Sequence, residues 1–147
     1  MASITPYLTF NGNCEEAFLF YKSVFGTEFE YIGKFGEMPP SDNENQHSLT
    51  QEEANRVMHV SLPIGKGTIL MGSDTTSQSG DAVIGTNVSM SLNTESRDEA
   101  NALFNGLSAD GTVIMAMQNT FWDAYFGMFV DKFGIHWMIN FDEIPQK

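Results

Sequence analysis

The sequence predicts an α+β protein built from two βαβββ modules, and two observations support this prediction. Segments in which apolar and polar residues alternate, typical of half-buried strands, occur together with two apolar stripes at helical spacing. The order strand, helix, strand, hairpin then occurs twice along the 147 residues, a length typical of one domain or of two small halves. We therefore expect a single domain, 1–147, with a first module over 1–74 and a second module over 82–143.

The first module starts with a predicted strand, 4–11, in which apolar and polar residues alternate. Pro6 lacks an N–H, so this strand is expected at the edge of a sheet. A helix follows, because the segment 14–25 carries one apolar stripe. Asn13 is expected to cap the helix in a capping box with Glu16, and the glycine after the stripe suits the C-terminal cap.

The rest of the first module contains a strand, 27–35, and a hairpin whose strands, 57–64 and 68–73, meet at a glycine-rich turn. The polar, proline-bearing stretch 36–55 between them lacks periodicity and is expected to be a loop. Its histidine, His47, is expected to be solvated.

The second module follows a segment of linker composition, 73–81, and begins with a predicted strand over 86–93. Ser96 and Glu99 form a second capping box before the second apolar stripe. A short strand over 112–117 is expected after this helix.

The closing hairpin carries much of the aromatic residue content of the second module. Its strands are expected over 121–130 and 135–141, joined by the turn 131–134, in which the glycine suits positive φ. Both tryptophans, Trp122 and Trp137, fall in this segment. A hairpin with this much apolar area must be covered on at least one face.

Composition and charge exclude several classes of partner. Lys and Arg total 7 against 19 Asp and Glu, for a net charge of −12, which does not suit a nucleic-acid surface or an anionic membrane. No apolar run approaches the roughly 20 residues that span a bilayer, and the N-terminus lacks the basic region of a signal peptide. The single cysteine, Cys14, excludes an internal disulfide, lies on the predicted helical stripe, and is expected to be a core residue rather than a nucleophile. We expect a cytoplasmic protein.

Three segments carry a resemblance to a known family: ITPYLTFNGNCEEAFLFYKSVFG, VMHVSLPIGKGTILMGSD and TFWDAYFGMFVDKFGIHW. They resemble the PhnB-like branch of the vicinal oxygen chelate superfamily, which includes glyoxalase I, extradiol dioxygenases and bleomycin-resistance proteins. The resemblance implies a glyoxalase/bleomycin resistance-like fold, a curved half-open barrel around a cleft, and a homodimer. Some members of this branch carry the label of a demethylubiquinone methyltransferase, but this sequence has no glycine-rich loop of the methyltransferase type, so we expect no methyl transfer.

Metal-dependent members of the superfamily hold their ion with four residues that line the cleft. The positions that align with these ligands are Thr5, Leu70, Asn87 and Met138. None of the four is a histidine or a carboxylate, the donors that divalent-metal sites need. We therefore expect no metal site and no cofactor.

Strand alternation predicts which residues line the cleft if Thr5 and Asn87 face it. The residues expected to point into the cleft are Tyr7, Thr9, Ser89, Ser91, His136, Met138 and Asn140. The residues expected to pack under the helices are Leu8, Phe10, Met90, Leu92, Trp137 and Ile139. A concave surface with hydroxyl and amide groups suits a small polar ligand. The alternative is that these residues face solvent on an open sheet.

Two further residues of the central hairpin are candidates because the family usually carries a histidine and an aspartate there. His59 is expected to anchor a ligand or to serve the structure, in preference to acting as a base. Asp74, at the end of a strand, is expected to form a turn. The candidate ligand-binding residues are Tyr7, His59, Asn87, Ser89, Trp122 and His136.

These observations favour a protein that binds an unidentified small molecule in the cleft. Two alternatives stay open. The first is a divalent-metal-dependent lyase, isomerase or dioxygenase of the glyoxalase or extradiol dioxygenase type. The second is a dimeric protein-interaction module.

Overall fold

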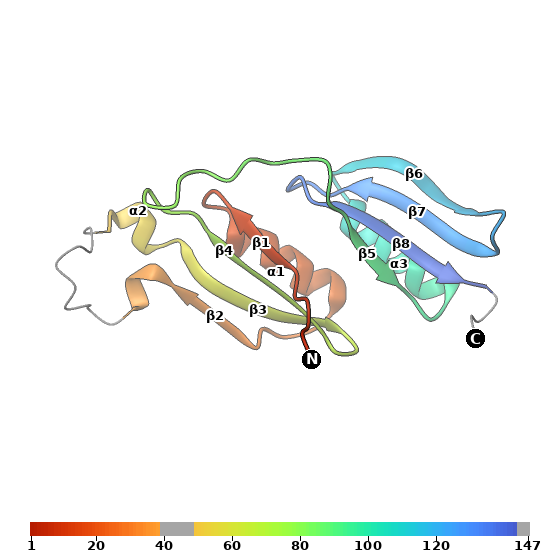
Figure 1. The fold of residues 1–147 in the computed structure, drawn as a ribbon, viewed down its shortest axis with the longest axis horizontal. Helices are drawn as coiled ribbons and strands as arrows, with labels where there is room; N and C mark the ends of the chain where they lie inside the picture. Colours follow the sequence, from red (N-terminus) through yellow and green to blue (C-terminus); the bar gives the residue numbers. More distant parts are fainter. Residues whose placement is uncertain (39–48, 144–147) are drawn as a thin grey trace. The chain divides into compact units, whose positions relative to one another are not determined.

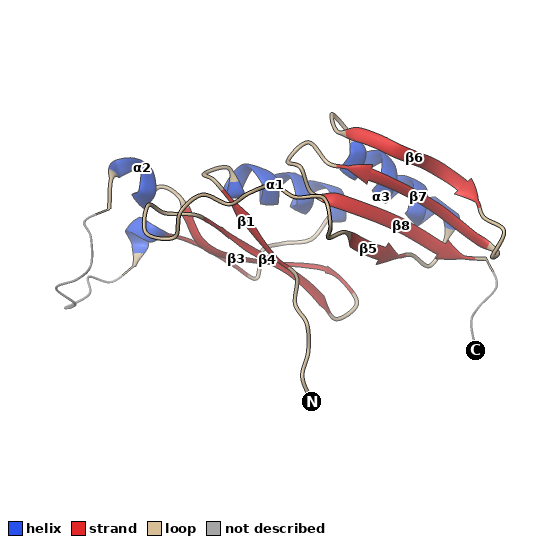
Figure 2. Cartoon of the chain, turned by 45° about the horizontal axis from the view of Figure 1, so that its top comes forward, coloured by secondary structure: helices blue, strands red, loops and turns tan. Residues whose placement is uncertain are grey.

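Each half of the chain folds as one four-stranded sheet with a helix across one of its faces (Figures 1 and 2). The computed structural model describes residues 1–38 and 49–143, so the prediction for His47 lies outside the described residues. Contacts between residues divide the chain into two compact units, Met1–Ala82 and Val83–Lys147. The predicted α+β class and the βαβββ order of each half are confirmed.

The first unit has one sheet in the strand order β1-β4-β3-β2. Its elements are β1 (Tyr7–Phe10), α1 (Cys14–Phe25), β2 (Tyr31–Lys34), the 3-10 helix η1 (Phe35–Glu37), α2 (Gln51–Ala54), β3 (Val57–Gly65) and β4 (Thr68–Asp74). Strand β1 runs parallel to β4, and the other neighbours are antiparallel. Strand β1 is an edge strand, as Pro6 predicted. The short helix α2 lies in the stretch expected to be a loop, where the Thr50 side chain accepts a hydrogen bond from the Glu53 N–H.

The core of the first unit lies between α1 and the sheet. Phe18 of α1 is fully buried and contacts the rings of Phe10 and Tyr21 edge to face. Gly72 in β4 lies directly beneath it: a Cβ added there would come within 2.7 Å of the Phe18 ring and 2.6 Å of the Leu8 carbonyl oxygen. The close approach of helix and sheet therefore depends on the missing side chain at Gly72.

The second unit repeats the arrangement with the strand order β5-β8-β7-β6. Its elements are β5 (Met90–Asn93), α3 (Arg97–Ser108), β6 (Thr112–Asn119), β7 (Ala124–Val130) and β8 (His136–Asp142). Strand β5 runs parallel to β8, and β6, β7 and β8 form an antiparallel meander. The Ser96 half of the capping box predicted for α3 is confirmed, because the Ser96 hydroxyl accepts a hydrogen bond from the Glu99 N–H at 3.0 Å. The Glu99 carboxylate accepts from the Glu95 N–H and not from the Ser96 N–H that the capping box requires.

The turn of the closing hairpin is built around a buried aspartate. Asp131 accepts hydrogen bonds from the N–H groups of Phe133 and Ile135 through one oxygen, and from the indole Nε1 of Trp137 through the other. Gly134 has a φ of 91°, as predicted for this turn. Trp137 is 1% exposed and packs beneath α3, which confirms its predicted face.

Two predicted strands of the second unit are longer than the observed ones. Strand β5 begins at Met90 instead of residue 86, because Met90, opposite Trp137, is its first residue that pairs with the parallel partner β8. Strand β7 begins at Ala124, so Trp122 lies in the turn before it and is half exposed. None of the described helices has the length and apolar character that crossing a membrane requires.

Candidate functional site

Three rings gather on the face of the first sheet that points away from α1, which we call the open face. The hydroxyl oxygen of Tyr7 lies 3.3 Å from Nδ1 of His59, and the two rings stack with centroids 5.7 Å apart. The ring of Tyr31 lies 6.0 Å from His59 on the other side. Tyr7 and Tyr31 remain 48% and 49% exposed. The cluster therefore offers aromatic surface and a histidine to solvent from a rigid sheet.

Register explains why these residues share a face. Tyr7 pairs with Met71 in β4, Met71 pairs with Ser61 in β3, and Ser61 pairs with Tyr31 in β2. Paired residues point to the same side of a sheet, and residues two apart along a strand do so as well. His59 is two residues from Ser61 and therefore joins this side. Tyr7 and His59 are thus the two sequence candidates that the structure brings into contact.

A pocket of about 570 Å³ lies at the end of the same face. Thr9 and Ser73, which pair with each other two residues along from Tyr7 and Met71, belong to its lining. The remaining lining residues are Phe35, Asp74, Thr75, Thr76, Ser79, Gly80, Asp81 and Ala82. Most of the pocket wall therefore comes from the segment that the sequence predicted to be a linker.

The wall of the pocket is held against the first strand by Asn11. Its side-chain amide donates to the Ala82 carbonyl oxygen at 3.0 Å and accepts from the Ala82 N–H at 2.8 Å, as a neighbouring strand would. The Thr75 hydroxyl donates to the same amide oxygen, and the Thr75 N–H donates to the Phe10 carbonyl oxygen. Residues 75–82 therefore belong to the first unit as a docked loop.

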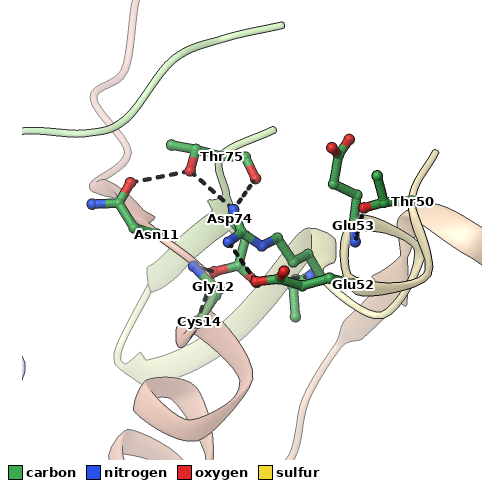
Figure 3. Close-up of polar contacts among 10 residues, drawn as sticks. Asn11, Gly12, Cys14, Thr50, Glu52, Glu53, Asp74 and Thr75 are labelled. Carbon is green, nitrogen blue, oxygen red and sulfur yellow. Dashed lines mark hydrogen bonds and ion pairs between the residues drawn. The ribbon is translucent and has the colours of Figure 1, made fainter. Parts of the chain in front are cut away.

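Asp74 joins three segments of the first unit beside this pocket (Figure 3). One carboxylate oxygen accepts from the N–H groups of Gly12 and Cys14 at 2.8 and 2.9 Å, and the other accepts from the Val57 N–H at 2.9 Å. The predicted cap of α1 is wrong, because the Asn13 side chain makes no capping hydrogen bond. The prediction that Asp74 forms a turn is also wrong: its side chain caps α1 and fixes the start of β3.

Arg56 lies next to Asp74 in the same network. Its guanidinium donates to the Thr75 carbonyl oxygen at 3.0 Å and to a carboxylate oxygen of Glu52 at 3.2 Å. A Cβ at Gly12, whose φ is 111°, would come within 3.1 Å of this guanidinium. The Nε of Arg56 is buried and finds no hydrogen-bond partner within residues 1–38 and 49–143. Arg56 thus fastens the pocket wall to the strand that carries His59.

Cys14 is fully buried at the start of α1, as predicted for a core residue. Burial, followed by the negative charges of Asp74 and Glu15, raises the pKa of the thiol far above its ordinary value of 9.0. A thiol that stays protonated is a poor nucleophile. Cys14 therefore serves packing.

The other four candidates belong to the second unit. His136 lies on the face of the second sheet that points away from α3, opposite Val130. Trp122 contacts Phe126, which pairs with Asn140 of β8. Asn140 lies four residues along β8 from His136, so Trp122 and His136 lie at different ends of that face. Asn87 and Ser89 precede β5 and are exposed.

The aligned metal positions do not share one face. Leu70 is fully buried opposite Leu62, on the side of the first sheet that α1 covers, so its assignment to the cleft is wrong. In the described residues, no group of three or more His, Cys, Asp and Glu side chains is arranged to hold a metal ion.

Three features of the site were not predicted from the sequence. Tyr31 was placed in a strand, but nothing local indicated that this strand would bring it to His59. The pocket wall was interpreted as a linker because it is rich in turn residues. The role of Arg56 in holding the pocket wall depends on its contact with Thr75, 19 positions along the chain, for which the sequence carries no local signal.

Comparison with known proteins gives consistent matches along the chain. Residues 2–140 match the family model described as 3-demethylubiquinone-9 3-methyltransferase. Protein YjdN of Escherichia coli (strain K12) is 36% identical over 144 residues, covering 93% of each chain.

Solved structures agree with this match. Protein PA1353 from Pseudomonas aeruginosa is 39% identical with a TM-score of 0.80, covering 97% of this chain and 98% of its own. The putative 3-demethylubiquinone-9 3-methyltransferase, PhnB protein, from Bacillus cereus is 25% identical with a TM-score of 0.70, covering 95% and 99%. A glyoxalase/bleomycin resistance protein/dioxygenase family enzyme from Burkholderia phytofirmans PsJN shares the fold at 16% identity, with a TM-score of 0.59 over 92% and 96%.

Proposed function

The chain belongs to the PhnB-like family described as 3-demethylubiquinone-9 3-methyltransferase, within the glyoxalase/bleomycin resistance superfamily, and from this premise we propose that it is a small-molecule-binding protein. The proposed site is the open face of the first sheet, with the Tyr7–His59–Tyr31 cluster and the pocket beside it. The ligand we propose is small and carries no net negative charge, since the chain has a net charge of −12.

The observation that supports this proposal best is the half-exposed ring cluster around His59. Its Nδ1 is engaged by the Tyr7 hydroxyl, which leaves the other ring nitrogen to donate to or accept from a ligand. The flanking rings of Tyr7 and Tyr31 offer flat apolar surface on each side. Small-molecule sites commonly combine apolar or aromatic surface with a few polar groups that fix orientation.

Methyl transfer, which the family description names, fits these residues poorly. A methyl donor with a charged carboxylate is commonly held at a glycine-rich turn that leads into a helix N-terminus, where backbone N–H groups bind the anion. Here the turn after β1 leads into α1, but the Asp74 carboxylate already accepts from the N–H groups of Gly12 and Cys14. A second anion at this end of α1 would meet that negative charge. Methyl transfer from such a donor is therefore not part of the proposed function.

We also propose that the protein is a cytoplasmic homodimer that uses no metal. The edge strand β6 supports the dimer, because it exposes Val113, Ile114 and Met115, and a second copy would remove these side chains and the open edge from water. Light scattering that gives the monomer mass at micromolar concentration would contradict the dimer. Elemental analysis after exhaustive dialysis tests whether the protein holds a metal ion. One tightly held ion per chain would favour a metal-dependent enzyme instead.

The proposed site can be tested with small neutral rings as probes. Saturation-transfer NMR with benzamide, phenol and nicotinamide should give ligand signals with the unmodified protein. We expect these signals to be lost in His59→Ala and strongly reduced in Tyr31→Ala, because each change removes part of the binding surface. The matched control is Leu19→Ala, which shortens a half-exposed side chain on the outer side of α1. Equal signals from all four proteins, each shown to be folded by circular dichroism, would refute the site.

A further inference from the structure

The pocket at the end of the open face has a lining rich in hydroxyl groups. The hydroxyl side chains that line it are Thr9, Ser73, Thr75, Thr76 and Ser79. A hydroxyl both donates and accepts hydrogen bonds, so such a lining matches ligand hydroxyls in either role. Its volume, about 570 Å³, is in the range of small-molecule sites. The pocket is therefore suited to a ligand with several hydroxyl groups.

The charge of the lining selects among such ligands. Among the residues that the structure describes, the lining holds two carboxylates, Asp74 and Asp81, and no Lys, Arg or His. Both oxygens of Asp74 already accept backbone hydrogen bonds, so Asp81 is the carboxylate available to a ligand. A carboxylate attracts a cation and repels an anion, and the net charge of −12 acts in the same direction.

One wall of the pocket is aromatic. Phe35 is half-buried, and its backbone N–H donates to the Arg56 carbonyl oxygen, which holds the residue in place. An aromatic ring can pack against the apolar C–H face of a saturated ring and can also attract an ammonium group. The pocket thus combines hydroxyl groups, one carboxylate that is available to a ligand, and one aromatic ring.

The wall is also fixed before any ligand arrives. Asn11 holds Ala82 through two hydrogen bonds, and the Ser79 hydroxyl bonds to the backbone of Thr76. Ordering a loop on binding costs affinity, so a wall that is already ordered favours binding of a small ligand.

We propose that this pocket binds a small polyhydroxylated amine, a molecule of the size and chemistry of an amino sugar. The ammonium group would meet Asp81 and the apolar ring face would meet Phe35. The ligand hydroxyls would meet the side chains of Thr9, Ser73 and Thr76, since those of Thr75 and Ser79 already bond within the wall. This inference rests on the proposed function and names the ligand class for one end of the same face.

The test compares three sugars that differ in charge and share one ring: glucosamine, glucose and glucuronate. Binding is followed by the NMR shifts of the backbone amides of residues 75–82 on titration. Glucosamine should bind about ten-fold more tightly than glucose, the scale of one charged hydrogen bond, and glucuronate should bind most weakly. Asp81→Asn should remove the preference for glucosamine over glucose, whereas Phe35→Leu should weaken the binding of both sugars. The control Asp98→Asn, at an exposed carboxylate in the first turn of α3, should change neither the preference for glucosamine nor the affinity for either sugar.

Two results would overturn the assignment. The first is that none of the sugars shifts these amides; if neutral rings still bind in a His59-dependent manner, the proposed function stands and only the ligand class fails. The second is that glucuronate binds as well as glucosamine, or that Asp81→Asn leaves the preference intact. Equal neutral-ring signals from the unmodified protein and from His59→Ala, Tyr31→Ala and Leu19→Ala, with glucosamine still bound at residues 75–82, would instead refute the His59 site and keep the pocket.

Discussion

The carboxylate of Asp74 accepts a hydrogen bond at 2.9 Å from the backbone N–H of Cys14, a residue 60 positions away in the sequence. The first helix is thus capped by a residue of the last strand of its own unit. The helix of the second unit is capped locally instead, by the Ser96 hydroxyl three residues before Glu99. The two units therefore provide hydrogen-bond acceptors for the N–H groups at the start of their helices in two different ways.

Replacing Asp74 should destabilise the first unit strongly. Asp74→Ala leaves the N–H groups of Gly12, Cys14 and Val57 without their acceptor, and at least the latter two hydrogen bonds are buried. We expect a loss of roughly 3–5 kcal/mol in the free energy of unfolding, measured by urea denaturation. Asp98→Ala, at an exposed carboxylate of α3, is the control and should cost no more than about 1 kcal/mol. Equal midpoints for the two variants would contradict the role assigned to Asp74.

Adding one methyl group at Gly72 should also be costly. The new Cβ would lie 2.6 Å from the Leu8 carbonyl oxygen and 2.7 Å from the Phe18 ring, so helix and strand must move apart. We expect Gly72→Ala to lower the free energy of unfolding by about 1–3 kcal/mol. The control is Gly65→Ala at the end of β3 in the same hairpin, where an added Cβ meets no atom within 4 Å. Thermal denaturation that ranks the two variants the other way would refute the packing argument.

Two neighbouring residues of β8 should separate scaffold from surface. Trp137→Ala removes a side chain that is 1% exposed and bonded to Asp131, at a cost of roughly 3–5 kcal/mol. His136→Ala, on the opposite face, should leave the melting temperature within a few degrees. If His136→Ala unfolds while Trp137→Ala melts normally, the faces of the second sheet are inverted.

The buried thiol of Cys14 should make stability depend on alkaline pH. The raised pKa keeps the folded thiol protonated, whereas the unfolded thiol ionises near its ordinary value of 9.0. The stability that the neutral thiol contributes is therefore present below about pH 9 and is lost as the pH rises above it, by up to about 1.4 kcal/mol per pH unit. Cys14→Ala should be less stable at neutral pH, and its free energy of unfolding should lack this loss as the pH rises. Parallel pH profiles between about pH 8 and pH 10 would show that the thiol is not responsible.

Local patterns predicted the parts of the fold that depend on local interactions. The end of α1 follows from Gly26, which adopts a φ of 69° without steric cost. Alternation placed Tyr7 and Phe10 on opposite faces, and the structure shows Phe10 buried and Tyr7 half exposed. The Asn13 cap failed, although its pattern was local, because the start of α1 is held by a carboxylate from a distant strand, which accepts from the N–H groups of Gly12 and Cys14.

Features set by pairing partners were beyond a single sequence. Residues 86–89 alternate like a strand, but the pairing of β5 with β8 begins only at Met90, opposite Trp137. Likewise, the contact between Tyr31 and His59 depends on β2 lying next to β3. The pocket depends on the Asn11 amide reaching Ala82, a contact between residues 71 positions apart.

From the distance along the chain between Cys14 and Asp74 we infer an order of events in folding. The cap of α3 lies within its own first turn, so this helix can nucleate early from local contacts. The cap of α1 becomes available only when β4 is in place, after a long loop has been closed at an entropic cost. During synthesis the whole of α1 is made well before Asp74, so we expect α1 to gain its cap only after the last strand of its unit has been made. The cap of α3 comes from Ser96, the residue just before the helix, so it is available as soon as the helix forms.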